Sequence, residues 1–185
     1  MSSMLLGILQ SQAAGGGATY EHLTTFSPGT ASSWSINGLD AYSDYTHLHI
    51  TATLQAQRNE VLFMKFNNDT GNNYSMGYIR GGDGSSANAS AANYYDAGAI
   101  EFAEVMARNS EGVSIMSLDI LDFRSTTKQK SLRGLTGQSN ATRHRIAQGL
   151  GSYQSTNAID SIQMSIQGNY ASTSETRFSI YGIRG

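Results

Sequence analysis

The chain of 185 residues has no cysteine, one proline and only 14% charged residues. Without cysteine it can form no disulfide bond, no thiolate nucleophile and no cysteine-ligated metal site. Its formal net charge is −2, so it lacks the excess of one sign that draws a protein to nucleic acid or to an anionic membrane. Glu and Lys are too scarce for the exposed faces of a helical bundle. These absences exclude several functional classes and leave the cellular compartment open.

Uncharged polar residues and glycine dominate the composition. Ser, Thr, Asn and Gln account for 62 residues and Gly for another 20, while 39% of the chain is hydrophobic. That hydrophobic content is too high for a disordered chain, and the length is that of one ordinary domain. We therefore predict an all-β protein, an antiparallel β-sandwich of jelly-roll-like form, with polar strand faces and many turns.

The first 17 residues differ from the rest. Residues 4–9 form a short apolar run, and residues 15–17 are three glycines. Because no Lys or Arg precedes Arg58 and the apolar run is short, we expect neither a secretory signal nor membrane insertion. We predict a short N-terminal apolar helix or arm with a Gly linker in residues 1–17, then a single β-sandwich domain in residues 18–185. The side chains expected to dock on a partner, or on the domain itself, are Met4, Leu5, Leu6, Ile8 and Leu9.

Period-two alternation of apolar and polar residues marks the strands. The clearest run covers residues 47–57, and a turn at 58–60 leads to a second run over 61–66. Turn signals recur roughly every ten residues, which is the spacing of a β-sandwich. Residues 83–93 are small and polar and are expected to form a loop. Helical periodicity is weak along the chain except in residues 4–12 and 89–97. The predicted core consists of Trp34, Leu48, Ile50, Leu54, Leu62, Met64, Phe66, Leu118, Ile120, Ile162, Met164, Ile166, Phe178 and Ile180.

Two pairs of residues are candidates for chemistry. His47 and His49 project from the same face of the first strand, as two metal ligands would, but the neighbouring threonines equally suit an exposed polar face. Asp119 and Asp122 are three positions apart, which separates them on a strand, whereas paired catalytic carboxylates must converge on one bond. We therefore expect no catalytic residue, no metal and no cofactor, and we expect that the protein is not an enzyme.

Half of all Lys and Arg residues lie between residues 123 and 159, in a stretch with no Asp or Glu. One alternative is a positive patch that binds phosphate or an acidic polymer; the other is a solvated sheet edge or an ion-pair surface between subunits. Aromatic residues are not interleaved as in nucleic-acid-binding surfaces, so we favour the second alternative and expect no nucleic-acid partner. The candidate interaction residues are Arg124, Lys128, Lys130, Arg133, Arg143 and Arg145.

The end of the chain, residues 177–185, reads Arg-Phe-Ser-Ile-Tyr-Gly-Ile-Arg-Gly. It resembles the closing strand of many small virion structural proteins of tailed bacteriophages, which typically end in Phe-x-Leu-Tyr-Gly-Ile-Lys-Gly. Arg184 stands where that pattern has lysine, so the charge is kept. Further segments are similar in the same order along nearly the whole chain: residues 4–9, 48–54, 66–75, 118–123 and 159–162.

The resemblance implies a non-enzymatic structural component of a tailed bacteriophage virion. We expect a tail fibre or baseplate protein that acts in assembly and host attachment. It would form a homo-oligomer, with a trimer preferred, and bind other virion proteins; a host surface glycan is a further candidate partner. The alternatives are a capsid decoration or cement protein and a carbohydrate-binding module. Four tyrosines expected in loops would suit such contacts: Tyr74, Tyr78, Tyr94 and Tyr95.

Overall fold

The computed structural model describes residues 19–83, 86–108, 110, 112–139 and 144–185. The predicted N-terminal helix or arm, with its docking side chains, lies outside the described residues and stays a prediction. Within the described residues the backbone forms twelve strands and two short 3-10 helices. They are β1 (Tyr20–Phe26), β2 (Ser33–Asn37), η1 (Leu39–Tyr42), β3 (His47–Ala56), β4 (Glu60–Phe66), β5 (Tyr74–Asp83), β6 (Ser86–Ala97), β7 (Ile100–Arg108), β8 (Ser114–Leu121), β9 (Lys130–Ser139), β10 (His144–Tyr153), β11 (Ser161–Ile166), η2 (Gln167–Asn169) and β12 (Arg177–Ile183).

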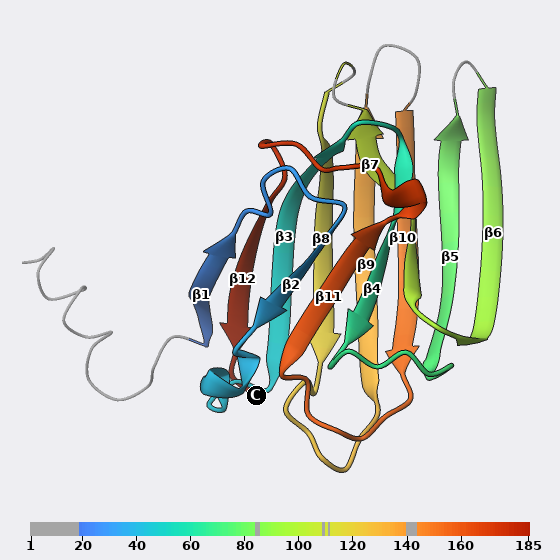
Figure 1. Cartoon of the computed structure of the whole chain (residues 1–185). Coiled ribbons are helices and arrows are strands. Elements are labelled where there is room, and N and C mark those ends of the chain that lie inside the picture. The colour runs from blue at the N-terminus through green and yellow to red at the C-terminus, as the bar shows by residue number, and fades with distance from the viewer. Residues whose placement is uncertain (1–18, 84–85, 109, 111, 140–143) are drawn as a thin grey trace, which may run out of the picture.

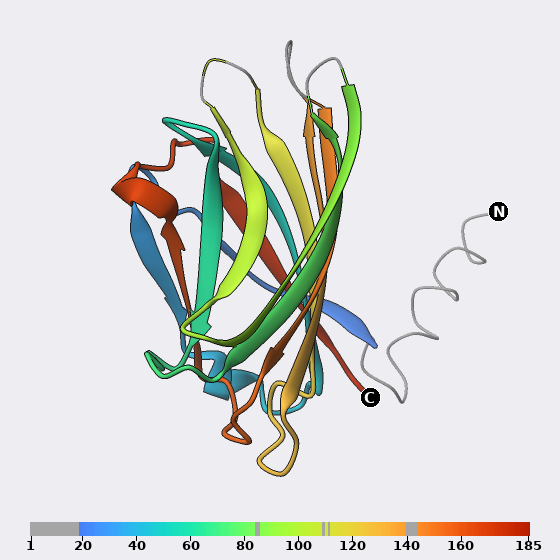
Figure 2. The same ribbon diagram turned by 90° about the vertical axis from the view of Figure 1, so that its right-hand side faces the viewer.

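The strands form two antiparallel sheets that lie face to face (Figures 1 and 2). In the described chain, the larger sheet has the order β1-β12-β3-β8-β9-β10-β5-β6, and we call it the eight-stranded sheet. The smaller, four-stranded sheet has the order β2-β11-β4-β7. A short parallel pairing of residues 55–56 with residues 107–108 joins the two sheets where β3 meets β7. The all-β antiparallel sandwich predicted from the sequence is confirmed.

The core lies between the two sheets. Leu48, Ile50 and Leu54 of β3 are fully buried, and the side chains of β8 and β12 beside them pack against those of β2, β4 and β11. Burying one such side chain contributes about 1.5–3 kcal/mol relative to leaving it in water. Every residue of the predicted core is buried. The alternation along each strand therefore identified the inward face correctly.

The ends of two strands follow the predicted turn chemistry. After β4, Asn67 and Asn68 both have a φ of 54°, in the left-handed region that asparagine tolerates better than most residues. After β8, Asp122 also has a φ of 54°, and the reversal brings Phe123 back into the core, where it is fully buried. Leu121 and Phe123 are both apolar but differ in parity from Leu118 and Ile120, and the end of β8 at Leu121 accounts for this change.

Residues 83–93 do not form the predicted loop, and residues 89–97 are not helical. Apart from residues 84–85, which the structure does not describe, both segments belong to the hairpin of β5 and β6. Small residues have weak strand propensity on their own, but here β5 supplies the backbone partners. Gly77 pairs with Asn93, and a side chain at Gly77 would overlap the amide oxygen of that asparagine. The pairing, and not the local sequence, therefore determines the strand.

The four tyrosines predicted to lie in loops lie in strands instead, two in β5 and two in β6. Tyr74 is fully buried, and its ring stacks on Tyr153 with the ring centroids 5.1 Å apart. The backbone N–H of Phe66 donates a hydrogen bond to the Tyr74 hydroxyl at 3.0 Å. Burial raises the pKa of Tyr74 to about 12. Tyr74 is therefore a core residue and is not available for contacts with a partner.

The segment that resembles phage virion proteins forms β12, which lies between β1 and β3. A side chain at Gly182 would overlap the ring of Tyr45, so the glycine makes room for this buried tyrosine. The Arg184 guanidinium lies 4.9 Å from the centroid of the same ring, and the Tyr45 hydroxyl donates a hydrogen bond to Glu21 at 2.5 Å. The Tyr-Gly-Ile-Arg sequence thus anchors the end of the chain to the sandwich.

Candidate functional site

The eight-stranded sheet turns one face to the core and the other, which we call the outer face, away from the four-stranded sheet (Figure 2). Along β8, Met116 and Leu118 point inward and are buried, whereas Ile115 points outward and is 63% exposed. Neighbouring strands repeat this pattern of outward apolar residues. The large apolar side chains of the outer face, each more than 40% exposed, are Ile79, Ile115, Leu121, Leu135, Ile146 and Leu150. On most soluble proteins, exposed large apolar side chains are scattered singly over the surface.

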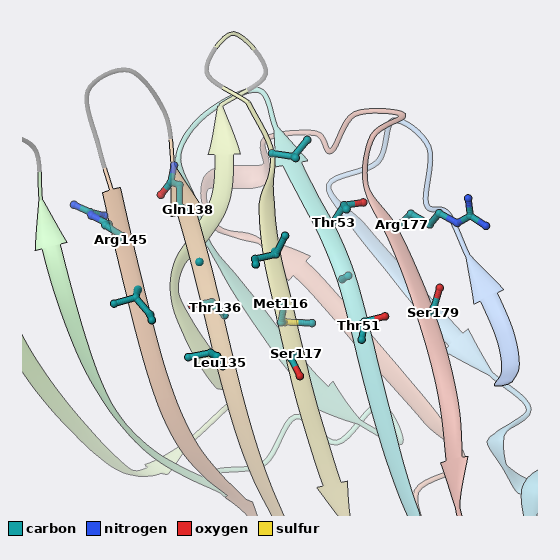
Figure 3. Close-up of a pocket in the computed structure, with 15 residues that line it drawn as sticks. Thr51, Thr53, Met116, Ser117, Leu135, Thr136, Gln138, Arg145, Arg177 and Ser179 are labelled. Atoms are coloured by element: carbon teal, nitrogen blue, oxygen red, sulfur yellow. The ribbon is translucent and has the colours of Figure 1, made fainter. Parts of the chain in front are cut away.

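Strand pairing brings several of these side chains together around a hollow. Gly137 of β9 pairs with Ile115 of β8 on one side and with Ile146 of β10 on the other. A groove of about 740 Å³ opens around these residues on the outer face (Figure 3). We call it the outer groove. The residues that define it here are Thr51, Thr53, Ile115, Leu135, Ile146 and Arg177.

The apolar surface continues beyond the outer groove toward β5 and β6. A second hollow shares Leu135 and Ile146 with the groove and extends to Ile79 and Ala91. A third shares Ile79 and Ala91 and extends to Leu150. A largely apolar surface therefore crosses the outer face from β3 to β6.

A row of polar residues crosses the same face, nearer the start of β3 and the end of β12. His49, Asp119 and Arg133 lie opposite one another on β3, β8 and β9. The His49 Nδ1 is 2.7 Å from one carboxylate oxygen of Asp119, and the Arg133 guanidinium donates to the other oxygen at 2.7 Å. Burial raises the pKa of the Asp119 carboxyl, but the hydrogen bonds from His49 and Arg133 and their charges outweigh it and hold that pKa below its usual value. Asp119 is therefore a stable carboxylate at neutral pH.

Two tyrosines extend this polar row toward β1. The rings of Tyr20 and Tyr181 are stacked with their centroids 4.9 Å apart, and the Tyr20 ring lies 5.8 Å from that of His49. Tyr20 is 48% exposed. Burial, together with Tyr181 and Asp119, raises the pKa of Tyr20, so its hydroxyl stays protonated and can donate a hydrogen bond. Exposed rings beside a carboxylate and a guanidinium form a surface that polar, ring-shaped ligands could contact.

The two histidines considered as metal ligands make separate hydrogen bonds. His49 pairs with Asp119, whereas the Nδ1 of His47 accepts the backbone N–H of Asp122 at 2.9 Å. Over the described ranges, no group of three or more His, Asp or Glu side chains is placed to hold a metal ion. Asp119 and Asp122 do not converge either, because Asp122 lies beyond the end of β8 and its carboxylate is 3.2 Å from the Lys128 ammonium.

Three of the candidate basic residues form ion pairs with aspartates. Arg124 pairs with Asp160, Lys128 with Asp122 and Arg133 with Asp119. Arg145 is half-buried and lies at the border of the outer groove. Arg143 lies outside the described residues. That the exposed basic residues form an interaction patch stays a prediction.

Lys130, the remaining basic residue, is in the interior. It is fully buried, and its ammonium donates hydrogen bonds to the backbone carbonyls of Ser125, Lys128 and Thr156 at 2.6, 2.8 and 2.9 Å. Burial lowers the pKa of this ammonium, and the Asp122 carboxylate partly offsets the effect. Lys130 therefore joins two loops at one end of the sandwich.

The fold and its surface define an all-β sandwich whose larger sheet carries an apolar groove on its outer face. Comparison with models of known protein families and with curated protein sequences gives no match. In the part of the chain that the structure describes, none of the helices has the length and apolar character needed to cross a membrane.

Sequence reasoning missed the outer groove. Leu135 and Ile146 stand among polar residues and glycines and show no clear alternation. One signal was available: in β8 the apolar residues continue on both parities, so that Ile115 and Leu121 must point away from the face that carries Leu118. The partner strands that complete the groove could not be identified without the sheet order.

Proposed function

We propose that this protein is a structural component of a tailed bacteriophage virion, a tail fibre or baseplate protein that acts in assembly and host attachment. The structural observation that carries the role in assembly is the exposed apolar surface centred on the outer groove. Single exposed apolar residues are ordinary, but contiguous apolar patches mark surfaces that another molecule covers. A protein that is built into a larger assembly has such a surface.

The charged groups of the outer face support a structural role. His49 and Arg133 both bind the carboxylate of Asp119, and Lys128 binds that of Asp122. Nucleophilic or acid–base catalysis needs groups that converge on a vacant position next to a substrate. In the described residues these side chains are engaged with one another, which favours a non-enzymatic protein.

The phage assignment rests on the resemblance of several segments, and the fold is compatible with it. The closing segment forms β12 inside the eight-stranded sheet, where Gly182 and Arg184 hold Tyr45. Residues 118–123 cover the end of β8 and the reversal that returns Phe123 to the core. The shared motifs therefore lie at positions on which the sandwich depends, as expected if related proteins share this framework.

We further propose that the protein forms a homo-oligomer, with a trimer preferred, and that it binds other virion proteins. A capsid decoration protein would use the same apolar surface on the head. A second function, glycan binding, is favoured by one observation: Tyr20 and Tyr181 are stacked beside Asp119 and Arg133. Aromatic rings can pack against the apolar faces of sugars, while carboxylate and guanidinium groups bind hydroxyls.

Purified phage particles provide the test. Antibodies against this chain are expected to label the tail by electron microscopy, and particles lacking the chain are expected to lose adsorption to the host. Labelling of the head with loss of head stability would support the capsid alternative and contradict a tail position. Absence of the chain from particles would contradict the virion proposal.

A further inference from the structure

We propose that residues 4–9 of one copy bind in the outer groove of a neighbouring copy. This inference rests on the proposed assembly into a homo-oligomer and names the contact that would hold the copies together. It is carried by the chemistry of the groove, the chemistry of the chain before β1 and the place at which that chain enters the sandwich.

The floor of the groove is apolar, and the charged residues of its lining are two arginines, Arg145 and Arg177. Ile115, Leu135 and Ile146 are 63%, 48% and 58% exposed, and the gap at Gly137 separates Ile115 from Ile146. Figure 3 shows Thr51 and Thr53 along one side of the groove and Arg177 at its border. Such a surface is best covered by a short segment that brings apolar side chains and no charge.

The chain before β1 has this composition. No Asp, Glu, Lys or Arg occurs before Glu21, so the first charged side chain of the protein lies inside β1. Five of the six residues from Met4 to Leu9 are large and apolar. A run this short cannot bury itself, whereas insertion into the groove would remove both apolar surfaces from water.

The entry point of the chain determines which grooves the segment can reach. The backbone is held at Thr19, whose carbonyl accepts the N–H of Arg184 at 3.0 Å. Tyr20 pairs with Ile183 at the end of β12, whereas Arg177 of the groove lies at the start of β12. The chain therefore enters the sandwich at the end of the sheet away from the groove. Eleven residue steps separate Leu9 from Tyr20, a reach of up to about 36 Å at 3.3 Å per residue.

The direction of β1 favours a neighbouring copy. β1 runs from the Ile183 end of β12 toward its Phe178 end, so the residues before Tyr20 approach from the side away from the groove. To occupy the groove of its own chain, the segment would have to reverse and cross the polar row of Tyr20, Tyr181 and His49. The groove of a neighbouring copy requires no such crossing.

Such a contact is head-to-tail, because each copy contributes one segment and one groove. Contacts of this kind close into a ring when the rotation between copies permits, and they leave no groove empty. A closed trimer would thus fill the outer groove of every copy.

The first experiment measures oligomeric state by light scattering over a range of concentrations, with the full-length chain throughout. The groove variant is Ile146→Asp and the segment variant is the double substitution Leu6→Asp and Ile8→Asp. The matched control is Leu121→Asp, an exposed outer-face leucine outside the groove lining. We expect an oligomer for the unchanged chain and the control. We expect a monomer with an unchanged circular dichroism spectrum for the groove and segment variants, and a melting temperature below that of the oligomer because the stabilising contact between copies is lost.

The second experiment identifies the partners of the segment. A photo-crosslinking amino acid replaces Leu6 in a ¹⁵N-labelled copy, which is mixed with unlabelled copies before irradiation. We expect mass spectrometry to find crosslinks from labelled Leu6 positions to unlabelled peptides of β8, β9 and β10. Crosslinks confined to one copy, or oligomers that persist in both variants, would overturn the inference and leave the virion proposal standing. Absence of the chain from purified particles would instead overturn the virion proposal.

Discussion

The two faces of the eight-stranded sheet are built from the same strands and differ in what covers them. On the inner face, Leu48, Leu118 and Phe178 are fully buried against the four-stranded sheet. On the outer face, Ile115 and Ile146 are more than half exposed, and within the described residues no strand or helix lies over them. The inner face therefore accounts for the stability of the sandwich. The outer face has exposed apolar surface that the sandwich itself does not bury, and this surface supports the proposed assembly.

The largest predicted effect comes from a charge on the inner face. Leu54→Asp places a carboxylate at a fully buried position, and its cost should be comparable to the whole stability of the domain, on the order of 5–15 kcal/mol. The variant should be unfolded by circular dichroism. Leu135→Asp on the outer face is the control and should change the unfolding free energy of the isolated subunit by only about 0.5 kcal/mol. Normal melting of Leu54→Asp would show that the two faces have been assigned wrongly.

The next prediction compares two cations. Lys130→Met should lower the unfolding free energy by about 3–5 kcal/mol, because it leaves three backbone carbonyls without their buried donor. Arg133→Met removes an exposed cation from the outer face and should cost at most about 1 kcal/mol. Urea denaturation measures both. Equal losses would mean that Lys130 contributes no more than a surface ion pair.

A smaller effect is expected for the buried tyrosine hydroxyl. Tyr74→Phe leaves the N–H of Phe66 without its acceptor, and such a loss costs about 1–3 kcal/mol. Tyr95 is 77% exposed, so Tyr95→Phe provides a matched control that should be neutral. Both are read from the midpoint of urea unfolding. If the two variants unfold at the same concentration, the Tyr74 hydroxyl has no role in stability.

The two faces should also differ in how their stability responds to pH. Tyr74 has a raised pKa of about 12, so the native state binds its proton more tightly than the unfolded chain does, and stability is lost as the pH rises from 10 to 12. Asp119 has a lowered pKa, so its contribution is present above its ordinary value of 3.8 and is lost at more acidic pH. The alkaline loss should be reduced in Tyr74→Phe, and the acid loss should be reduced in Asp119→Asn. Unchanged pH profiles in these variants would contradict the assignment.

The sequence predicted the inner face well and the outer face poorly, for a physical reason. Burial imposes a strict alternation, so Leu48, Ile50 and Leu54 identify the core side of β3 without any knowledge of its neighbours. The outer groove depends on which strands are adjacent, since Ile115 and Ile146 come together only through Gly137 of the strand between them. The same limit applies to β6, whose small residues form a strand because β5 pairs with them. In the sequence, Lys130 looks like the other basic residues of segment 123–159. Only the three-dimensional fold shows that three backbone carbonyls accept hydrogen bonds from its ammonium.

Imaging of intact particles by cryo-electron microscopy tests the central claim most directly, namely that the outer face is an assembly interface of a virion protein. The account predicts density for this sandwich in the tail, with β8, β9 and β10 turned toward a neighbouring subunit and additional density in the outer groove. A particle in which this face points to solvent, or in which the protein has no density, would contradict the account.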